Sequence, residues 1–221
     1  MHYAPQTGSC PLPFSPFKSC TVPRQIGWLS TISRNGTPSL AAFSQWQNLT
    51  FDPPMVMFAS NQFSSGESKH TFVNAEETGQ FVGNMATYDL RKAINISAIS
   101  VPEGEDEFQH TGVTTQSCIS APCPRVLESP KHFECGYLST HRLRGNSNHG
   151  WVEVVYEEVM HIHGNDTFLT AEEKMDTPKI RPLARLWYYD YTSVTEFFEM
   201  QIRGGKAATH QGLEGKSSLK T

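Results

Sequence analysis

Long apolar runs are absent from this chain of 221 residues. A membrane-spanning helix requires about 20 consecutive, mainly apolar residues, so we expect no membrane span. The first residues, MHYAPQTGSCPLPFSPF, contain neither a basic start nor an apolar stretch, and we therefore expect no signal peptide. Together these absences favour a cytoplasmic protein.

An excess of positive charge is lacking as well. The chain has 18 Lys and Arg residues against 22 Asp and Glu residues, and its formal net charge is -4. A nucleic acid or an anionic membrane is therefore not the expected partner. The first expected strand is not followed by G-x-G-x-x-G, which argues against a Rossmann dinucleotide domain. A hydrophobic share of 38% is sufficient for one packed domain.

Signatures of metal sites and nucleophiles are weak. None of the cysteines has C-x-x-C spacing, so we expect free thiols and no structural zinc. His161 and His163 share a strand face with Glu153 and Glu157, but the apolar residues between them favour a packed face over a metal site. No order of Ser, His and Asp or of Cys and His indicates a nucleophile. The five cysteines are Cys10, Cys20, Cys118, Cys123 and Cys135.

Strand and turn signals dominate the first half of the chain. Residues 22–33 are typical of a strand, and Asn35-Gly36 predicts a tight hairpin turn. Residues 39–50 then return antiparallel, with polar side chains on both faces, as expected for a strand that lines a cleft or for a solvated edge strand. The next expected elements are a break at 52–54, a buried strand at 55–59, a helix at 66–79 with Ser68 as a possible cap and Gly79 at its end, and a strand at 80–86.

The second half of the chain contains the most regular alternation. We expect a helix over 89–99, a helical turn over 105–110, and long strands over 131–143 and 149–163. Strands outnumber helices, which predicts a mainly β fold, an antiparallel and nearly closed barrel. Residues 1–17 form an extended arm, 18–203 the domain, and 204–221 a disordered tail in this interpretation. The predicted core face of the last long strand carries Val152, Val154, Tyr156, Met160 and Ile162.

Several segments occur in the order found in a known family. They read VPRQIGWLST, AAFSQWQNLTFDPPMVMF, SKHT and FVGN, and later DEF, ESP, FEC and RPLARL followed by Tyr191. Over residues 20–200 the chain resembles the flavin-reductase-like family of FMN-binding split barrels, which includes flavoredoxins. The resemblance implies an antiparallel split β-barrel with a few inserted helices, an FMN cofactor, NAD(P)H as co-substrate, and a homodimer with flavin near the interface.

The start of the first helix is the candidate phosphate site. A phosphate dianion is favoured by hydroxyl groups, a cation and the positive end of a helix dipole. Ser68, Lys69, His70 and Thr71 offer these groups, although an ordinary capped helix would look the same. Arg24 is a further candidate for the phosphate or the ribityl chain, or a surface arginine.

Other polar residues are candidates for the rest of the cofactor. Ser44 and Asn48 share a face of an unbulged strand, where they could hydrogen-bond the pyrimidine edge of the ring. Trp46 between them packs either on the ring or in the core. Asn61 and Asn84 are candidates for holding ribityl or phosphate oxygens. The alternative is that each merely caps the end of a strand. Ile26 of the PRQI segment completes the candidate cofactor-binding set.

The chain departs from the family pattern at three places. Gln25 replaces a proline, His70 replaces the acidic residue of KDT, and Trp187 and Tyr188 replace glycines. The two aromatics would narrow the space over the flavin and favour a hydrophobic organic substrate over a nicotinamide. Arg185 and Tyr191 are weak catalytic candidates on the substrate side.

The resulting hypothesis is an FMN-dependent NAD(P)H oxidoreductase that passes electrons to flavin, oxygen or a small organic acceptor. Three alternatives stay open: an FMN enzyme acting directly on a specialised metabolite, a non-enzymatic flavin or electron carrier, and a barrel resembling pyridoxamine oxidases.

Overall fold

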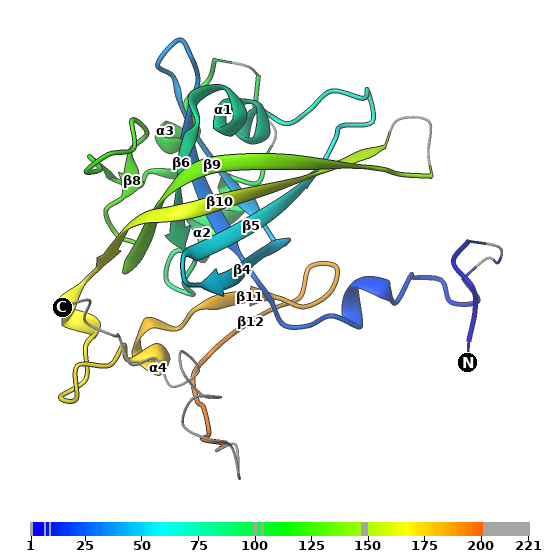
Figure 1. Cartoon of the computed structure of the whole chain (residues 1–221). Helices are drawn as coiled ribbons and strands as arrows, with labels where there is room; N and C mark the ends of the chain where they lie inside the picture. The colour runs from blue at the N-terminus through cyan, green and yellow to red at the C-terminus, as the bar shows by residue number, and fades with distance from the viewer. Residues whose placement is uncertain are drawn as a thin grey trace.

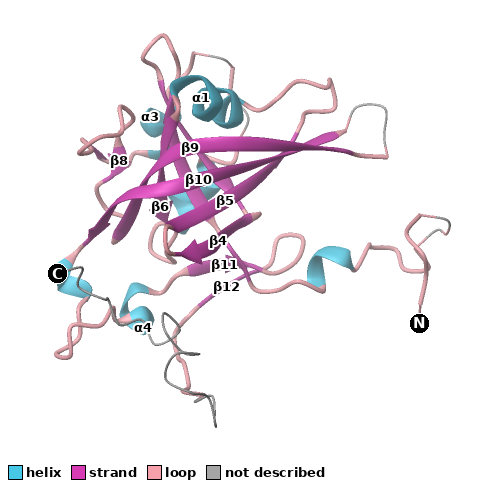
Figure 2. Cartoon of the chain, viewed as in Figure 1, coloured by secondary structure: helices cyan, strands magenta, loops and turns pink. Residues whose placement is uncertain are grey.

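Strands make up most of the regular structure in a computed structural model of the chain, as the magenta arrows of Figure 2 show. The structure describes residues 2–6, 8, 10–99, 101–102, 104–146 and 150–200. The predicted tail at 204–221 lies outside these residues. The strands are β1 Arg24–Gln25, β2 Gly27–Ile32, β3 Pro38–Phe43, β4 Trp46–Phe51, β5 Pro54–Asn61, β6 Gln80–Met85, β7 Thr115–Gln116, β8 Arg125–Val126, β9 Lys131–Arg144, β10 Trp151–Gly164, β11 Leu183–Arg185 and β12 Tyr191–Ser193. The helices are α1 His70–Thr78, α2 Arg91–Ile96, α3 Glu107–Thr111 and α4 Thr177–Ile180, with single 3-10 turns at Phe17–Ser19 and Asp166–Phe168.

A seven-stranded antiparallel sheet, in the order β3-β2-β6-β9-β10-β5-β4, forms the body of the molecule (Figure 1). Its two edge strands, β3 and β4, follow each other directly in the chain, so the sheet curls until its edges approach. Ala59 N–H of β5 donates to the carbonyl of Gln45, in the connection between β3 and β4, at 2.9 Å, which extends the β4–β5 pairing toward β3. A second sheet, β1-β11-β12, lies below the first, and a short β7-β8 pair lies at the side. The predicted antiparallel split barrel is confirmed.

Two apolar clusters share strand β2. Leu29 faces the barrel interior and belongs to the first cluster, whereas Trp28 faces the opposite way into the second. Successive side chains of a strand point to opposite faces, so β2 is buried on both. The first cluster comprises Leu29, Phe43, Val56, Phe58, Phe72, Ala75, Phe81, Cys135, Val155 and Val159. The second comprises Ile26, Trp28, Leu40, Ala86, Ile94, Phe108, Val126 and Leu183.

The predicted single strand over 39–50 is wrong, because the chain leaves β3 at Phe43 and starts β4 at Trp46. The close packing of Trp46 explains the break: a Cβ on Gly27 would lie 2.7 Å from its ring, and one on Gly83 would lie 3.0 Å from it. The ring of Trp46 thus packs closely against β2 and β6. Ser44 and Asn48 no longer belong to one strand face.

The preceding hairpin is confirmed, but not with a two-residue primed turn. Ser33 N–H donates to the carbonyl of Thr37 at 2.9 Å, so three residues form the loop. Among them only Gly36 has a positive φ, of 83°. This is the arrangement in which a left-handed glycine ends a three-residue hairpin loop.

The predicted core face of β10 is also wrong. The buried residues are those on the opposite face, with Glu153 1% exposed, Glu157 0%, Val155 0% and Val159 8%. In the sheet they are direct neighbours of residues of β5, Glu157 of Val56 and Val155 of Phe58. The face of Val152, Val154 and Tyr156 is only half-buried and points away from the barrel interior. A bulge between Val159 and His161 then turns Ile162, which is 65% exposed, to the side of Phe133.

The helices begin later or are shorter than predicted. Helix α1 starts at His70, with Lys69 as its N-cap residue, and not at residue 66. It ends at Gly79 as expected, where φ is 75°. Helix α2 covers only part of 89–99, and α3 confirms the predicted helical turn. Within the described ranges, no helix has the length and apolar character to cross a membrane.

Candidate functional site

The N-terminus of α1 is free of side-chain capping. The cap residue Lys69 makes no side-chain hydrogen bond to the helix, and the first turn contains no acidic residue. The first hydrogen bond runs from Val73 N–H to the Lys69 carbonyl, at 3.1 Å. The earlier N–H groups have no partner inside the helix, which leaves a positive helix end able to bind an anion.

Lys69 adds a cation beside this helix end. Its Nζ lies 5.5 Å from the centre of the Phe43 ring, and its side chain is half-buried. Burial lowers the pKa of the Lys69 ammonium group. None of the ion pairs found among the described residues includes Lys69. A half-buried cation without a carboxylate partner is energetically suited to an anionic ligand.

The other three phosphate candidates point elsewhere. Ser68 Oγ donates to Glu153 at 2.6 Å, so Ser68 does not cap α1. Thr71 is buried at 3% exposure. His70 and Ser68 line a cavity of about 670 Å³ beside α1. The structure therefore separates the four residues that the sequence places together.

The cavity lined by His70 is dominated by acidic groups. Glu67, Glu77, Glu105 and Glu107 all line it, and Arg34 is paired with Glu77 at 3.2 Å. Burial raises the pKa of Glu107, although Leu40 N–H and Ser39 Oγ donate to its carboxylate. Repulsion makes this cavity unfavourable for a phosphate, in contrast to the side of α1 that carries Lys69.

The candidates for the ring edge and ribityl chain lie in different places. Ser44 lines one cavity, while Asn48 and Trp46 line another of about 310 Å³. Trp46 packs edge-on against Phe81, with ring centres 6.3 Å apart, as expected for its core alternative. Asn61 is exposed at the end of β5. Their roles toward FMN stay predictions.

Both polar atoms of the Asn84 side chain form hydrogen bonds within the fold. Its Nδ2 donates to the Trp28 carbonyl at 2.9 Å and to Ser30 Oγ at 3.2 Å. Its Oδ1 accepts from Val126 N–H at 2.8 Å. The amide therefore joins β2, β6 and β8.

Arg24 also bonds to the chain itself. Its guanidinium donates to the carbonyls of Lys18 and Thr21, and its Cα is paired with that of Arg185. Burial, and then the charge of Arg185, lower the pKa of Arg24. The contact fastens the residues before β1 to the small sheet.

A cavity of about 540 Å³ between α2 and the β1-β11-β12 sheet brings four candidates together, namely Ile26, Ser44, Arg185 and Tyr191. The sequence reasoning missed the residues that α2 and its flanks add to it. The adjacent Arg91 and Lys92 at the start of α2 were the sequence signal that could have indicated this cavity. The residues that they face come from β11, about 100 positions later in the chain. The added lining residues include Tyr88, Arg91, Lys92, Asn95 and Tyr189.

Trp187 and Tyr188 do not line this cavity. Their rings lie 5.9 Å and 5.1 Å from that of Phe14, in edge-on geometry, and Trp187 Nε1 donates to the Ser15 carbonyl at 3.2 Å. These aromatics hold the N-terminal arm against the small sheet. Tyr189, the next residue, does line the cavity, as do Tyr88 and Tyr191.

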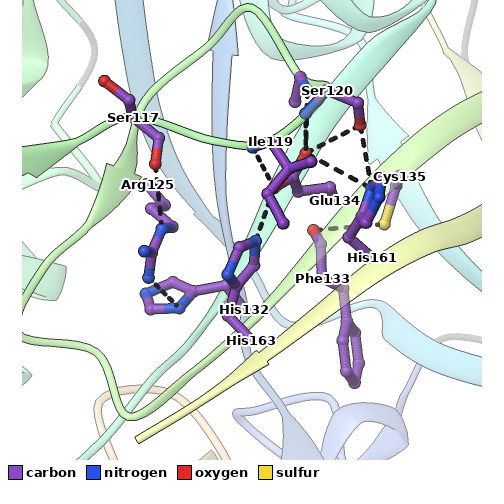
Figure 3. A network of polar contacts seen from close by, with 11 residues as sticks. Ser117, Ile119, Ser120, Arg125, His132, Phe133, Glu134, Cys135, His161 and His163 are labelled. Atoms are coloured by element: carbon purple, nitrogen blue, oxygen red, sulfur yellow. Dashed lines mark hydrogen bonds and ion pairs between the residues drawn. The ribbon is translucent and has the colours of Figure 1, made fainter.

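A separate polar network surrounds Glu134 (Figure 3). His163 Nε2 lies 2.6 Å from its carboxylate and His161 Nδ1 lies 3.9 Å away, so both histidines face Glu134 and not Glu153 or Glu157. The N–H groups of residues 119–121 donate to the same carboxylate. The described residues contain no group of three or more side chains placed to hold a metal ion.

Comparison with known proteins gives consistent relatives. An uncharacterized protein of Aquifex aeolicus is 29% identical over 168 residues, which cover 75% of this chain and 81% of that protein. The structure of nitrilotriacetate monooxygenase component B from Bacillus cereus has a TM-score of 0.83 at 21% identity, covering 90% of this chain and 98% of that one. Flavoredoxin of Desulfovibrio vulgaris has a TM-score of 0.70 at 20% identity, covering 93% and 100%. Both structures share the fold.

Residues 19–190 match the family described as Flavin reductase like domain. The match covers well over half of the chain and includes both sheets up to β11. The protein therefore belongs to the flavin reductase like domain family, whose members point to a flavin cofactor and to oxidoreductase or electron-carrier chemistry.

Proposed function

We propose that the protein binds FMN and acts as an oxidoreductase that takes hydride from NAD(P)H and passes electrons to flavin, oxygen or a small organic acceptor. Membership of the family supports a flavin cofactor. That the flavin is FMN and that NAD(P)H donates the hydride are what we propose beyond it. Bound FMN supplies the hydride and electron chemistry, and the chain binds and orients it.

One observation carries the proposal: Lys69 is a half-buried cation at the uncapped N-terminus of α1, and no carboxylate of the described residues is paired with it. This donor set fits a phosphate dianion, because a cation and free N–H groups together neutralise and hydrogen-bond it. In this assignment Lys69 and the first N–H groups of α1 hold the phosphate.

We also propose a homodimer that covers the outer face of β9 and β10. This face carries Leu143 and Met160, which are 47% and 39% exposed. Val152 on β10 is paired with Leu143 on β9, and the half-buried Val154 and Tyr156 lie between Val152 and Met160 on the same side of β10. A second copy of the same face would bury them, as expected when large apolar patches mark interfaces.

FMN titration of the apoprotein tests the cofactor site. Because a hydrogen-bonded charge contributes about 1.5–3 kcal/mol, Lys69→Gln should weaken FMN binding by about 10- to 100-fold. The matched control is Lys174→Gln, since Lys174 is exposed in a loop away from α1. Flavin fluorescence quenching gives the Kd.

Full FMN affinity in Lys69→Gln would reject the phosphate assignment, and a wild-type protein that binds no FMN at micromolar concentration would reject the proposed function. Anaerobic addition of NADH or NADPH to the FMN-loaded protein tests the donor. Bleaching of the flavin absorbance is expected, and tight FMN that neither nicotinamide reduces would indicate an electron carrier.

The cavity beside α2 favours a second candidate, an FMN enzyme acting directly on an organic metabolite. Its lining combines aromatic, apolar and cationic groups in about 540 Å³, a size typical of small-molecule sites. NADH turnover with free riboflavin as acceptor separates the candidates, because a dedicated enzyme should reduce riboflavin slowly.

A further inference from the structure

We propose that the cavity between α2 and the β1-β11-β12 sheet is a binding site for a small aromatic carboxylate. The site is separate from the phosphate site at α1, and binding there does not require the flavin. In the second candidate function above, the bound molecule would also be the substrate. We propose here only that it binds.

The charge of the cavity selects an anion. Arg91, Lys92 and Arg185 line it, and no Asp or Glu is among its lining residues. None of the three takes part in an ion pair within the described residues. The neighbouring Arg181 differs, because its guanidinium lies 3.5 Å from Asp89. Three cations without carboxylate partners at one cavity favour a negatively charged ligand.

Two of these cations are already held in place. Arg91 Nη1 donates to the Tyr88 carbonyl at 2.8 Å, and Arg185 Nη2 donates to the Tyr188 carbonyl at 2.7 Å. A guanidinium has five N–H donors, so each retains donors that match the two oxygens of a carboxylate. Positioning before binding reduces the entropy lost when the ligand is bound.

Aromatic rings line the same cavity. The guanidinium groups of Arg91 and Arg181 each lie 4.0 Å from the centre of the Tyr88 ring, and that of Arg185 lies 5.5 Å from the Tyr191 ring. Cations stacked on tyrosines present flat surfaces at the cavity wall. A planar ligand can lie against these surfaces.

The floor of the cavity is apolar and continues into the second core cluster. Ile94, Leu183 and Ile26 line it and are 4%, 7% and 8% exposed, and Ala42 and Ala98 lie among them. This floor favours contact with a hydrocarbon ring, because burying apolar surface there costs no hydrogen bonds to water. An aromatic ring on the floor with its carboxylate toward the arginines satisfies both parts of the cavity.

Isothermal titration with benzoate, and with benzamide as the neutral analogue, tests the inference. We expect benzoate to bind at least ten-fold more tightly than benzamide. Arg91→Gln and Arg185→Gln should each weaken benzoate binding about ten-fold or more and leave benzamide unchanged. The control is Arg142→Gln, because Arg142 is paired with Glu76 on the other side of the barrel, at 3.0 Å.

Equal binding of benzoate and benzamide, or an unchanged benzoate Kd in both cavity variants, would overturn the proposal. Benzoate binding is then repeated on protein saturated with FMN, where we expect the same Kd. Competition between the two ligands, or loss of FMN affinity in Arg91→Gln, would assign the cavity to the flavin and overturn the inference while leaving FMN binding intact. Thermal unfolding of each variant shows whether it is folded, and the weakening of benzoate binding by added NaCl provides a readout on the wild-type chain.

Discussion

Glu157 carries a carboxyl group inside the apolar interior of the barrel. Its side chain is fully buried, and neither of its carboxyl oxygens has a hydrogen-bond partner among the described residues. Burial raises the pKa of Glu157 to about 10. The group is therefore neutral in the folded protein at physiological pH, whereas in the unfolded chain it ionises above about pH 4.3. Folding stability is lost as the pH rises from that value toward 10.

Removing this acid should stabilise the protein at neutral and alkaline pH. Glu157→Gln keeps the size of the side chain and cannot ionise, so we expect a free energy of unfolding about 3 kcal/mol higher at pH 8 and nearly unchanged at pH 4. Urea unfolding at both pH values measures it. The control Glu158→Gln changes an exposed residue of the same strand and should have little effect. A gain in Glu157→Gln that is equal at both pH values would contradict the assignment.

His132 gives the opposite pH dependence. Burial, aided by the charges of Arg125 and His163, lowers the pKa of His132 to about 4, against about 6.5 in an unfolded chain. Below pH 6.5 the unfolded chain takes up the proton first, so stability falls between pH 6.5 and about 4. The shift corresponds to about 3 kcal/mol.

Replacing His132 should flatten this acid limb. In His132→Gln the free energy of unfolding should depend less on pH between 6.5 and 4, measured by urea unfolding across that range. His110→Gln, at an exposed histidine paired with Glu105, should leave the pH dependence of the wild type. An unaltered acid limb in His132→Gln would show that other groups cause it.

At the scale of elements, Glu134 fastens the loop of residues 117–121 to β9. Its carboxylate accepts three backbone N–H groups, at 2.7, 2.8 and 2.9 Å, and is bonded to His163. Burial alone would raise the pKa of Glu134, but these donors lower it below its usual range. The contribution of the ionised Glu134 to folding stability is fully present above about pH 4.3 and is lost as the pH falls below that value.

Glu134→Gln should release this loop while the barrel stays folded. We expect faster hydrogen exchange at the amides of Ile119, Ser120 and Ala121 at pH 7, and a stability loss of about 3 kcal/mol. Glu128→Gln is the control, because Glu128 also accepts a backbone N–H, from Thr114 at 2.9 Å, but from an exposed position. Exchange rates unchanged in Glu134→Gln would show that the loop is held by other contacts.

Element boundaries were predictable where local chemistry sets them. The Asp52-Pro53-Pro54 break, the glycine end of α1 at Gly79 and the strand character of 131–143 all depend on residues close in sequence. The break between β3 and β4 was not predictable, because it depends on Trp46 packing against Gly27 and Gly83. The same break separates Ser44 from Asn48, which line different cavities and do not share one strand face as predicted.

At the scale of the whole molecule, the outer face of β9 and β10 is the surface for which we expect a second copy. Met160→Glu or Leu143→Glu would place a charge there and should convert the dimer to a monomer. Analytical ultracentrifugation at several concentrations measures this. Ile99→Glu is the control, because Ile99 is 63% exposed just after α2, a helix that contacts α3 and β3. A wild-type protein that is monomeric at all concentrations would reject the dimer, and dimeric variants would place the interface elsewhere.

The sequence by itself determined the strand-rich class, most breaks between elements and the family, because these depend on local residue types and on motifs in a fixed order. Only the tertiary structure decided which face of β10 is buried. The alternation of residues defines two faces of the strand but does not show which of them lines the barrel interior. It also decided which candidates meet. Arg91 and Arg185 come from distant segments, and the curvature of the sheet, which brings α2 beside β11, cannot be derived from neighbouring residues.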